Sequence, residues 1–349
     1  MLSGEDANLA VQRATPGTAP RRRSLIAALP LAALLSLLLA AQADSGQDEA
    51  RRWLERMIEA AHTLNYEGTF VYVQGQHVEA MRITHSSGAA GEQQRMFSLS
   101  GLEREVVVAN NQVTCMRPAN QEMAFQSTVY RRSPLPLSLP KELGQLEHQY
   151  RFELLGEDRV AGKKSRIVVI KPRDALRFGY RFWLDNETGM VLRSALVDEG
   201  DRVLEQLMFT ELQFKTEPDL QPPPSTPSPP APEPAQAESK VEQVEQSSWT
   251  VTRLPAGFSQ VMHNRFKGDT VPPHPAEHLV FTDGLATVSV FLEPLGGAEP
   301  LLEGPAHMGA MNAFGKVIED HQLVVVGEVP QAAVAMIAAS VKFSKAGDR

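Results

Sequence analysis

The segment that comes nearest to a catalytic metal motif is His-Pro-Ala-Glu-His at residues 274–278. Its His-x-x-Glu-His spacing is that of one class of zinc peptidases, in which a helical turn brings two imidazoles to the metal and the acid to its water. Prolines at 272, 273 and 275 crowd its start, and the apolar residues 279–281 before Asp283-Gly284 indicate a strand. Because a helix and a third ligand are missing, we predict a surface loop that holds no metal.

Two other reactive patterns are incomplete. Ser98-Leu99-Ser100-Gly101 lacks the first glycine of the Gly-x-Ser-x-Gly turn that exposes a hydrolase nucleophile. Gly315-Lys316 has Ala310 in place of the first glycine of a phosphate-binding loop and Val317 in place of its Ser or Thr. Carboxylates are plentiful, but no readable pair stands out for acid-base catalysis. These patterns predict a binding protein that is not an enzyme and needs no cofactor.

Large apolar side chains offer a different kind of site, a hollow that holds a lipid. The candidates for its lining are Phe70, Tyr72, Met81, Met96, Phe178, Tyr180 and Phe182, from a broader set that adds Phe97, Met116 and Phe125. Flexible methionines suit ligands of variable shape. The same stripes also fit an ordinary filled core, and this alternative stays open.

The elements that must position these side chains are a helix and a series of strands. Apolar residues repeat with helical spacing along residues 48–64, where Trp53, Leu54, Met57, Ile58, Ala61 and Leu64 share one face. Residues 177–214 divide at two turns into a three-stranded meander, and alternation in its first strand places Phe178, Tyr180 and Phe182 on one face. Shorter strands are predicted at residues 70–73, 78–84, 104–109, 113–116 and 167–170. We predict an antiparallel sheet curved around the helix.

A proline-rich segment separates this domain from a second one. Nine of the seventeen residues from 218 to 234 are proline, and an acidic, Gln-rich stretch follows, so residues 217–248 are predicted to be an extended linker. The flanking domains are then residues 44–216 and 249–349. In the second, Asp283-Gly284 predicts a hairpin turn between strands, and Pro330 begins a helix with Val334, Ile337 and Val341 on one side. The second domain is therefore a smaller α+β unit.

The N-terminus has the pattern of an export signal. Three arginines at 21–23 precede an apolar run at 25–40, and Ala41-Gln42-Ala43 supplies the small residues that a signal peptidase reads. The run is interrupted by Pro30 and falls short of the roughly 20 residues that span a bilayer. We predict that residues 1–43 are a cleaved signal peptide with an N-terminal extension. The start codon and the choice between the Sec and twin-arginine routes stay open.

Net charge limits the classes of partner, and the cysteine content limits the disulfides that can form. Without residues 1–43 the chain has 30 basic and 40 acidic residues, a formal charge of −10. A duplex-binding protein needs a basic surface, so nucleic acid is not expected as a partner. Cys115 is the single cysteine, and no internal disulfide can form in the oxidising compartment to which the signal points.

Six segments, taken in order, resemble the sigma-E factor regulatory family, also called the RseB/MucB family. They are Leu64-Asn65-Tyr66-Glu67, Arg104-Glu105-Val106-Val107, the block 177–209 with Trp183-Leu184-Asp185 and Leu204-Glu205-Gln206, Trp249 with Leu254-Pro255-Ala256-Gly257-Phe258, Thr282-Asp283-Gly284-Leu285, and Val326-Gly327-Glu328-Val329-Pro330. None of them is a catalytic motif, so the specificity lies in their number and order across both domains. The departure from the family pattern is a longer proline-rich linker.

The resemblance implies an α+β protein made of an unclosed antiparallel β-barrel wrapped around a helix, like lipoprotein carriers, and a smaller C-terminal α+β domain. It implies a periplasmic regulator that binds the periplasmic domain of a membrane-anchored anti-sigma factor and protects it from proteolysis, thereby restraining the envelope-stress sigma factor. Lipopolysaccharide or another lipid would release the complex. The resemblance places most of the partner contact on the C-terminal domain.

Two other functions compete with this one. A periplasmic lipid or lipoprotein carrier would use the same hollow but needs no second domain on a proline linker. A hydrolase would require a catalytic group that the sequence does not show. The natural lipid, the partner surface and the oligomeric state, including a homo-oligomer, are left open by the sequence.

Overall fold

The computed structural model describes residues 29–88, 91–101, 103–109, 112–116, 123–125, 139–140, 142–216, 240–243, 247–267 and 276–344. Contacts divide the chain into two compact units, Met1–Asp44 and Ser45–Arg349. No helix in the described ranges has both the length and the apolar run needed to cross a membrane. Residues 1–28 of the predicted signal peptide lie outside the described residues. Its remaining residues, 29–43, belong to the first helix.

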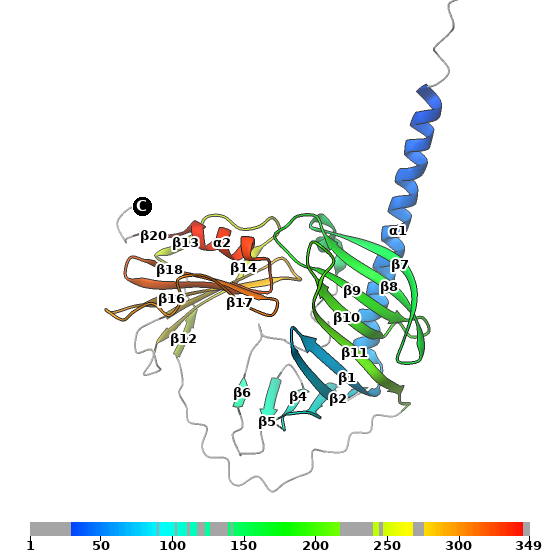
Figure 1. The fold of residues 1–349 in the computed structure, drawn as a ribbon, viewed down its shortest axis with the longest axis horizontal. Helices are drawn as coiled ribbons and strands as arrows, with labels where there is room; N and C mark the ends of the chain where they lie inside the picture. The colour runs from blue at the N-terminus through cyan, green and yellow to red at the C-terminus, as the bar shows by residue number, and fades with distance from the viewer. Residues whose placement is uncertain are drawn as a thin grey trace, which may run out of the picture. The chain divides into compact units, whose positions relative to one another are not determined.

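The N-terminal domain is an eleven-stranded antiparallel sheet with a long helix on one face (Figure 1). Helix α1 is Leu29–Thr63, and a short 3-10 helix, η1, is Leu143–His148. The strands are β1 Tyr66–Gln74, β2 His77–Gly88, β3 Gly91–Ser98, β4 Glu105–Ala109, β5 Gln112–Met116, β6 Met123–Phe125, β7 Tyr150–Val160, β8 Lys163–Pro172, β9 Gly179–Asp185, β10 Val191–Val197 and β11 Val203–Phe214. Their order is β6-β5-β4-β3-β2-β1-β11-β10-β9-β8-β7, so the first and last strands of the domain, β1 and β11, pair in the middle.

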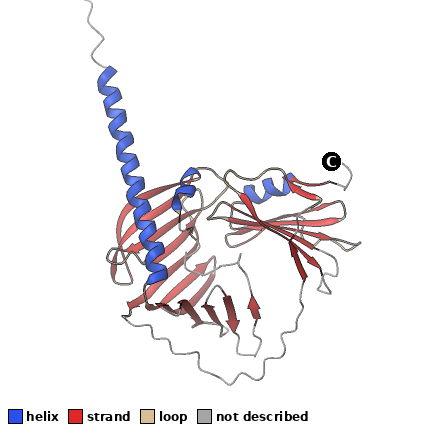
Figure 2. Cartoon of the chain, turned by 180° about the vertical axis from the view of Figure 1, so that it is seen from behind, coloured by secondary structure: helices blue, strands red, loops and turns tan. Residues whose placement is uncertain are grey.

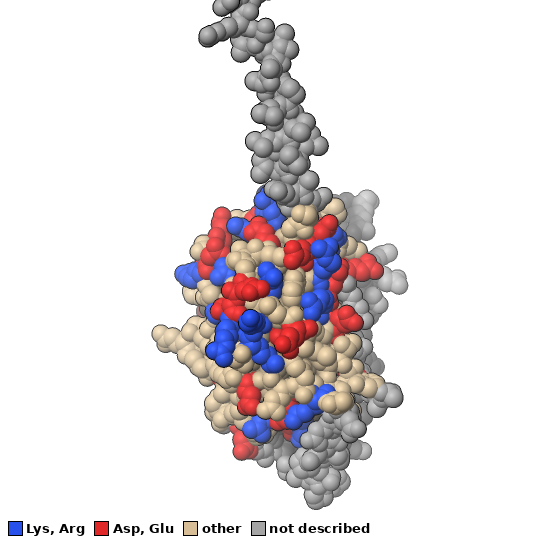
Figure 3. Space-filling model, turned by 90° about the vertical axis from the view of Figure 1, so that its right-hand side faces the viewer, with Lys and Arg blue, Asp and Glu red and all other residues tan. Residues whose placement is uncertain are grey.

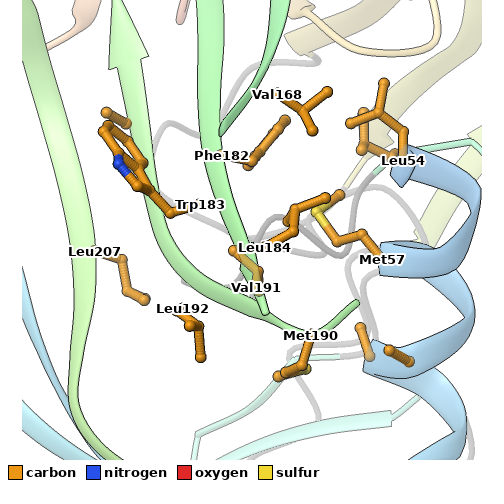
Figure 4. Packing of buried hydrophobic residues seen from close by; sticks show 14 of the residues in the cluster. Leu54, Met57, Val168, Phe182, Trp183, Leu184, Met190, Val191, Leu192 and Leu207 are labelled. Carbon is orange, nitrogen blue, oxygen red and sulfur yellow. The ribbon is translucent and has the colours of Figure 1, made fainter. Parts of the chain in front are cut away.

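The core of this domain lies between the sheet and the second half of α1. Leu54 and Met57 are fully buried and face Phe182 and Leu184 of β9 and Val168 of β8 (Figure 4). The alternation along β9 explains this contact, because even-numbered side chains share the face toward the helix. Each buried side chain of this size contributes about 1.5–3 kcal/mol to folding. The predicted helix and its apolar face are confirmed.

The C-terminal domain is a seven-stranded antiparallel sheet covered by a short helix (Figure 2). Its strands, in the order β12-β14-β15-β16-β19-β18-β17, are Lys240–Gln243, Ser259–Lys267, Ala276–Thr282, Thr287–Pro294, His321–Gly327, Met311–Ile318 and Gly304–Met308. Strands β13, Trp249–Val251, and β20, Val341–Phe343, form a separate pair. Helix α2, Gln331–Ser340, packs Val334 and Ile337 into the core, and it begins after Pro330 as predicted.

The predicted two-domain α+β class, with an unclosed antiparallel sheet around a helix, is confirmed. The Asp283-Gly284 turn joins β15 and β16, and Gly284 has φ +96, a conformation that glycine adopts without strain. One detail was not expected. Strand β12 pairs with β14 although residues 240–243 fall within the acidic stretch that composition assigns to the linker.

Candidate functional site

The seven residues predicted to line a lipid hollow do not share one environment. Phe70, Met81, Met96 and Phe182 are buried in the main cluster together with the apolar face of α1. Phe70 and Phe182 have no exposed surface. These four side chains therefore lie in a well-packed part of the core, where a ligand could enter only by separating the helix from the sheet.

The other three candidates lie at the border of that core. Tyr72 and Tyr180 are half-buried against it, and the Tyr180 ring stacks on Phe182 with centroids 5.9 Å apart. Phe178 belongs to a separate small cluster with Leu196 and Ala310. Tyr180 packs against both clusters and so joins them. The lining of a lipid site by these residues stays a prediction.

The three further residues of the broader apolar set are Phe97, Met116 and Phe125. Phe97 is 41% exposed, because it lies on the outer face of β3 while Met96 faces the core. It is therefore not a lining residue. The side chains of Met116 and Phe125 lie outside the described residues.

A buried arginine joins the two domains. The Arg177 guanidinium donates to the Asp283 carboxylate at 2.7 Å, to the Ala256 carbonyl at 2.7 Å and to Asp174 at 3.1 Å. The same Asp283 oxygen accepts the Tyr150 hydroxyl at 2.9 Å. The Arg177 and Asp283 side chains have no exposed surface, so the pair is shielded from solvent and from salt. We call these five residues the Arg177 cluster.

Apolar contacts surround the Arg177 cluster. Leu176 of the N-terminal domain packs against the core of the C-terminal domain, and Leu285 of the C-terminal domain packs against the core of the N-terminal one. Gly257 has φ +82, and a Cβ atom there would lie 2.8 Å from the side chain of Gln149. Glycine at this position lets the 254–258 turn approach the N-terminal domain closely.

A second contact between the domains is made by the turn between β17 and β18. Ala310 in this turn is 1% exposed and packs against Phe178 and Leu196. Its backbone N–H points to the Glu205 carboxylate, 3.4 Å away. Glu205, 8% exposed, also accepts hydrogen bonds from the Tyr72 hydroxyl, at 2.5 Å, and from the Gln74 amide. Three of the predicted lining residues are thus involved: Phe178 and Tyr180 belong to or pack against the cluster that holds Ala310, and Tyr72 is joined to the turn through Glu205.

Outside these contacts the charges are mixed. On the face shown in Figure 3, acidic and basic side chains lie interspersed, without an extended area of one sign. Surface pairs such as Arg181–Asp201 and Arg202–Asp198 are of this kind. This face does not have the continuous basic surface that binding to a nucleic acid backbone requires.

The structure corrects the surface loop predicted at residues 274–278. Glu277 and His278 lie in strand β15 and are 8% and 5% exposed, while His274 lies outside the described residues. Neighbouring residues of a strand point to opposite faces, so Glu277 and His278 cannot both reach one metal ion. The strand indicated by the apolar run 279–281 therefore begins earlier in the sequence and includes both Glu277 and His278.

The two residues have different roles in the domain. Burial alone would raise the pKa of Glu277. Its carboxylate accepts hydrogen bonds from His263 at 2.8 Å, Arg265 at 2.6 Å and Ser247 at 2.8 Å, and these lower the pKa to about 2. The His278 ring stacks on Phe291 with centroids 4.2 Å apart, and burial lowers the pKa of His278 to about 4. Glu277 is thus a charged hydrogen-bond acceptor, and His278 is neutral in the folded domain at pH 7.

Acidification should destabilise the C-terminal domain through His278. The unfolded chain binds a proton near pH 6.5 and the folded domain only near pH 4, so stability falls as the pH drops through this interval. We expect the urea midpoint to decrease from pH 7 to pH 5, and to decrease less in His278→Leu. His307→Leu, at an exposed histidine of the same domain, is the control and should retain the parent's decrease. Identical decreases in all three proteins would contradict the assignment to His278.

Comparison with known families covers both domains. The model described as the MucB/RseB N-terminal domain matches residues 49–232, and that described as the MucB/RseB C-terminal domain matches residues 243–342. The chain belongs to the MucB/RseB family. The resemblance found in the sequence is therefore confirmed.

Individual members of the MucB/RseB family align along nearly the whole chain. The sigma factor AlgU regulatory protein MucB of Pseudomonas aeruginosa is 30% identical over 90% of this chain and 98% of its own length. The sigma-E factor regulatory protein RseB of Escherichia coli K12 is 27% identical over 89% and 96%. The crystal structure of MucB in complex with MucA(peri) matches with a TM-score of 0.64 and 29% identity, over 85% of this chain and 100% of that one.

Several of the segments that carry the MucB/RseB resemblance meet around the Arg177 cluster. Residues 254–258 contribute the Ala256 carbonyl and Gly257, and residues 282–285 contribute Asp283 and Leu285. The cluster was not predicted as a site, because Asp283 was interpreted only as a turn residue and Arg177 only as the first residue of the predicted meander. A cation at the start of an apolar strand was the available signal, but its partner is 106 residues away in the sequence.

Proposed function

We propose that this protein regulates an envelope-stress sigma factor by binding, without catalysis. In this proposal it is exported to the periplasm and binds the periplasmic domain of a membrane-anchored anti-sigma factor. The bound protein protects that domain from the protease that begins its degradation, so the sigma factor stays restrained. Lipopolysaccharide or another lipid releases the complex.

The observation that carries this proposal is the likeness to MucB in its complex with MucA(peri). At 29% identity the likeness extends over the full length of that MucB chain, both domains included. A binding function also agrees with a chain in which the most deeply buried charged pair, among the described residues, joins two domains.

The lipid step is supported by the arrangement of the predicted lining residues. The helix and the sheet are separate layers held by side-chain packing, and Met57, Met81 and Met96 supply flexible side chains between them. The half-buried Tyr72 and Tyr180 lie at the border where an acyl chain would first make contact. An acyl chain that enters here would bury apolar surface without needing a charged partner.

The proposal is tested with protein purified from the cell envelope. We expect it to bind the periplasmic domain of the anti-sigma factor of the same cell, with MucA(peri) as a second probe, at a Kd of about 1 μM or tighter, which is about −8 kcal/mol. In envelope extracts it should lengthen the lifetime of the anti-sigma factor, and added lipopolysaccharide should shorten that lifetime again.

Different outcomes would distinguish the alternatives. Lipid binding without any binding of either periplasmic domain would favour the carrier function. Binding without a change in the lifetime of the anti-sigma factor would contradict the protective role.

A further inference from the structure

The turn between β17 and β18 lies against the ends of four adjacent strands of the N-terminal domain. Tyr180 on β9 pairs with Leu196 on β10, Leu196 with Glu205 on β11, and Glu205 with Gln74 on β1. This row of side chains crosses the sheet next to Phe178, and Ala310 packs on the Phe178 end of it. The C-terminal domain therefore covers one end of the face that carries α1.

We propose that this turn and an acyl chain compete for the same end of the N-terminal domain, so that lipid binding displaces the turn. The proposal rests on the lipid step of the proposed function and names how that step reaches the second domain. Three of the seven predicted lining residues, Tyr72, Phe178 and Tyr180, are the ones involved, through Glu205 in the case of Tyr72. An acyl chain in contact with them would take the place of Ala310.

The hydrogen bonds at Glu205 allow the turn to leave. When the Ala310 N–H moves away, the carboxylate keeps the Tyr72 hydroxyl and the Gln74 amide, so no buried charge is left without donors. The Ala310 N–H is the weakest of the three contacts, at 3.4 Å. The freed N–H lies at the tip of a hairpin, where water can replace the carboxylate.

The Arg177 cluster differs in this respect. Separation there would break the Arg177–Asp283 ion pair and the hydrogen bonds Arg177–Ala256 and Tyr150–Asp283, whereas the turn makes one backbone hydrogen bond to the N-terminal domain. The two contacts between the domains are thus unequal, and we infer that the turn is displaced while the Arg177 cluster holds. The C-terminal domain then pivots about the Arg177 cluster instead of separating from the N-terminal domain.

Gly309 provides a variant that disturbs only the contact of the turn. It has φ +60, and a Cβ atom there would lie 2.7 Å from the side chain of Gln74. Gly304 in the same hairpin has φ +83, and no atom lies within 4 Å of its Cβ position. Gly309→Leu and the control Gly304→Leu therefore carry similar backbone strain, but only the first inserts a side chain against the N-terminal domain.

The experiment measures the affinity of the full mature chain for a fluorescent sixteen-carbon fatty acid. We expect Gly309→Leu to bind this probe at least about fivefold more tightly than the parent, because the turn no longer occupies the site. Gly304→Leu should stay within about twofold of the parent. Ala310→Asp, which places a second carboxylate beside Glu205, is an independent variant expected to change the affinity in the same direction.

Hydrogen exchange at the Ala310 amide supplies a second readout. In the parent, exchange should accelerate when the probe is added, and in Gly309→Leu it should be fast without the probe. Equal or weaker probe binding by Gly309→Leu and Ala310→Asp would overturn the competition, since the turn would then be irrelevant to the site or part of its wall. No probe binding by any protein, with partner binding intact, would refute the lipid step itself and leave the partner-binding proposal standing.

Discussion

Replacing Arg177 with methionine should lower the free energy of unfolding by about 3–5 kcal/mol, the usual cost of removing one member of a buried ion pair. Asp283 would keep the Tyr150 hydroxyl and the N–H groups of Leu285 and Ala286 but would lose its counter-charge. Because the Arg177 cluster joins the two domains, we also expect the urea transitions of the two domains to lie further apart in the variant than in the parent. Tryptophan fluorescence and circular dichroism measure both effects.

Arg181→Met is the matched control for this prediction. Arg181 is four residues further along the chain, in β9, and pairs with Asp201, but the two side chains are 24% and 71% exposed. An exposed pair of this kind contributes about 0–1 kcal/mol, so the control should remain close to the parent. Combining Arg177→Met with Asp283→Asn should recover part of the loss, because the uncompensated charge is removed. Equally small losses in both single variants would show that the buried pair does not stabilise the protein.

Phe182→Arg should unfold the N-terminal domain. The ring has no exposed surface and packs between the β-sheet and Leu54 and Met57 of α1, so arginine would place an unpaired charge in a filled core at a cost of several kcal/mol. We expect the melting transition of this domain to be lost, while Phe182→Leu, which keeps an apolar side chain, should retain it with a smaller decrease.

Tyr180→Arg is the more informative substitution for the lipid hypothesis. Tyr180 is half-buried on the face of β9 that also carries Phe182. The long side chain of an arginine at position 180 can therefore reach solvent, and the domain should stay folded. This variant should lose lipid-triggered release of the partner and retain partner binding without lipid. A folded Tyr180→Arg that still releases the partner would exclude Tyr180 from the lipid site, and a folded, stable Phe182→Arg would show that the core is looser than its packing indicates.

The elements were predictable where one local pattern decides the structure. Residues such as Leu54 and Met57 repeat with the period of a helix, and residues 178–184 alternate with the period of a strand, so both faces could be assigned from neighbours in the sequence. The Asp283-Gly284 turn was predictable for the same reason. Each of these patterns lies within a single element.

The contacts between domains could not be predicted in this way. Arg177 and Asp283, or Ala310 and Phe178, meet only after two separate sheets have formed, and neither pair has a local signature. Residues 274–278 show the opposite failure, since their spacing matches a metal motif while the strand places Glu277 and His278 on opposite faces. Spacing predicts chemistry only when the backbone conformation is known.

Leu176 of the N-terminal domain packs against the C-terminal core, and Leu285 of the C-terminal domain packs against the N-terminal core. These contacts have a consequence for the order of folding. Translation produces the N-terminal residues first, so all of strand β11 has been synthesised before Leu285. The apolar surface of the N-terminal domain that Leu285 covers is therefore exposed until the hairpin of β15 and β16 has been synthesised and packs on it. A truncated chain that ends in the proline-rich segment 218–234 would keep this surface exposed, and such surfaces are what chaperones and quality-control proteases recognise.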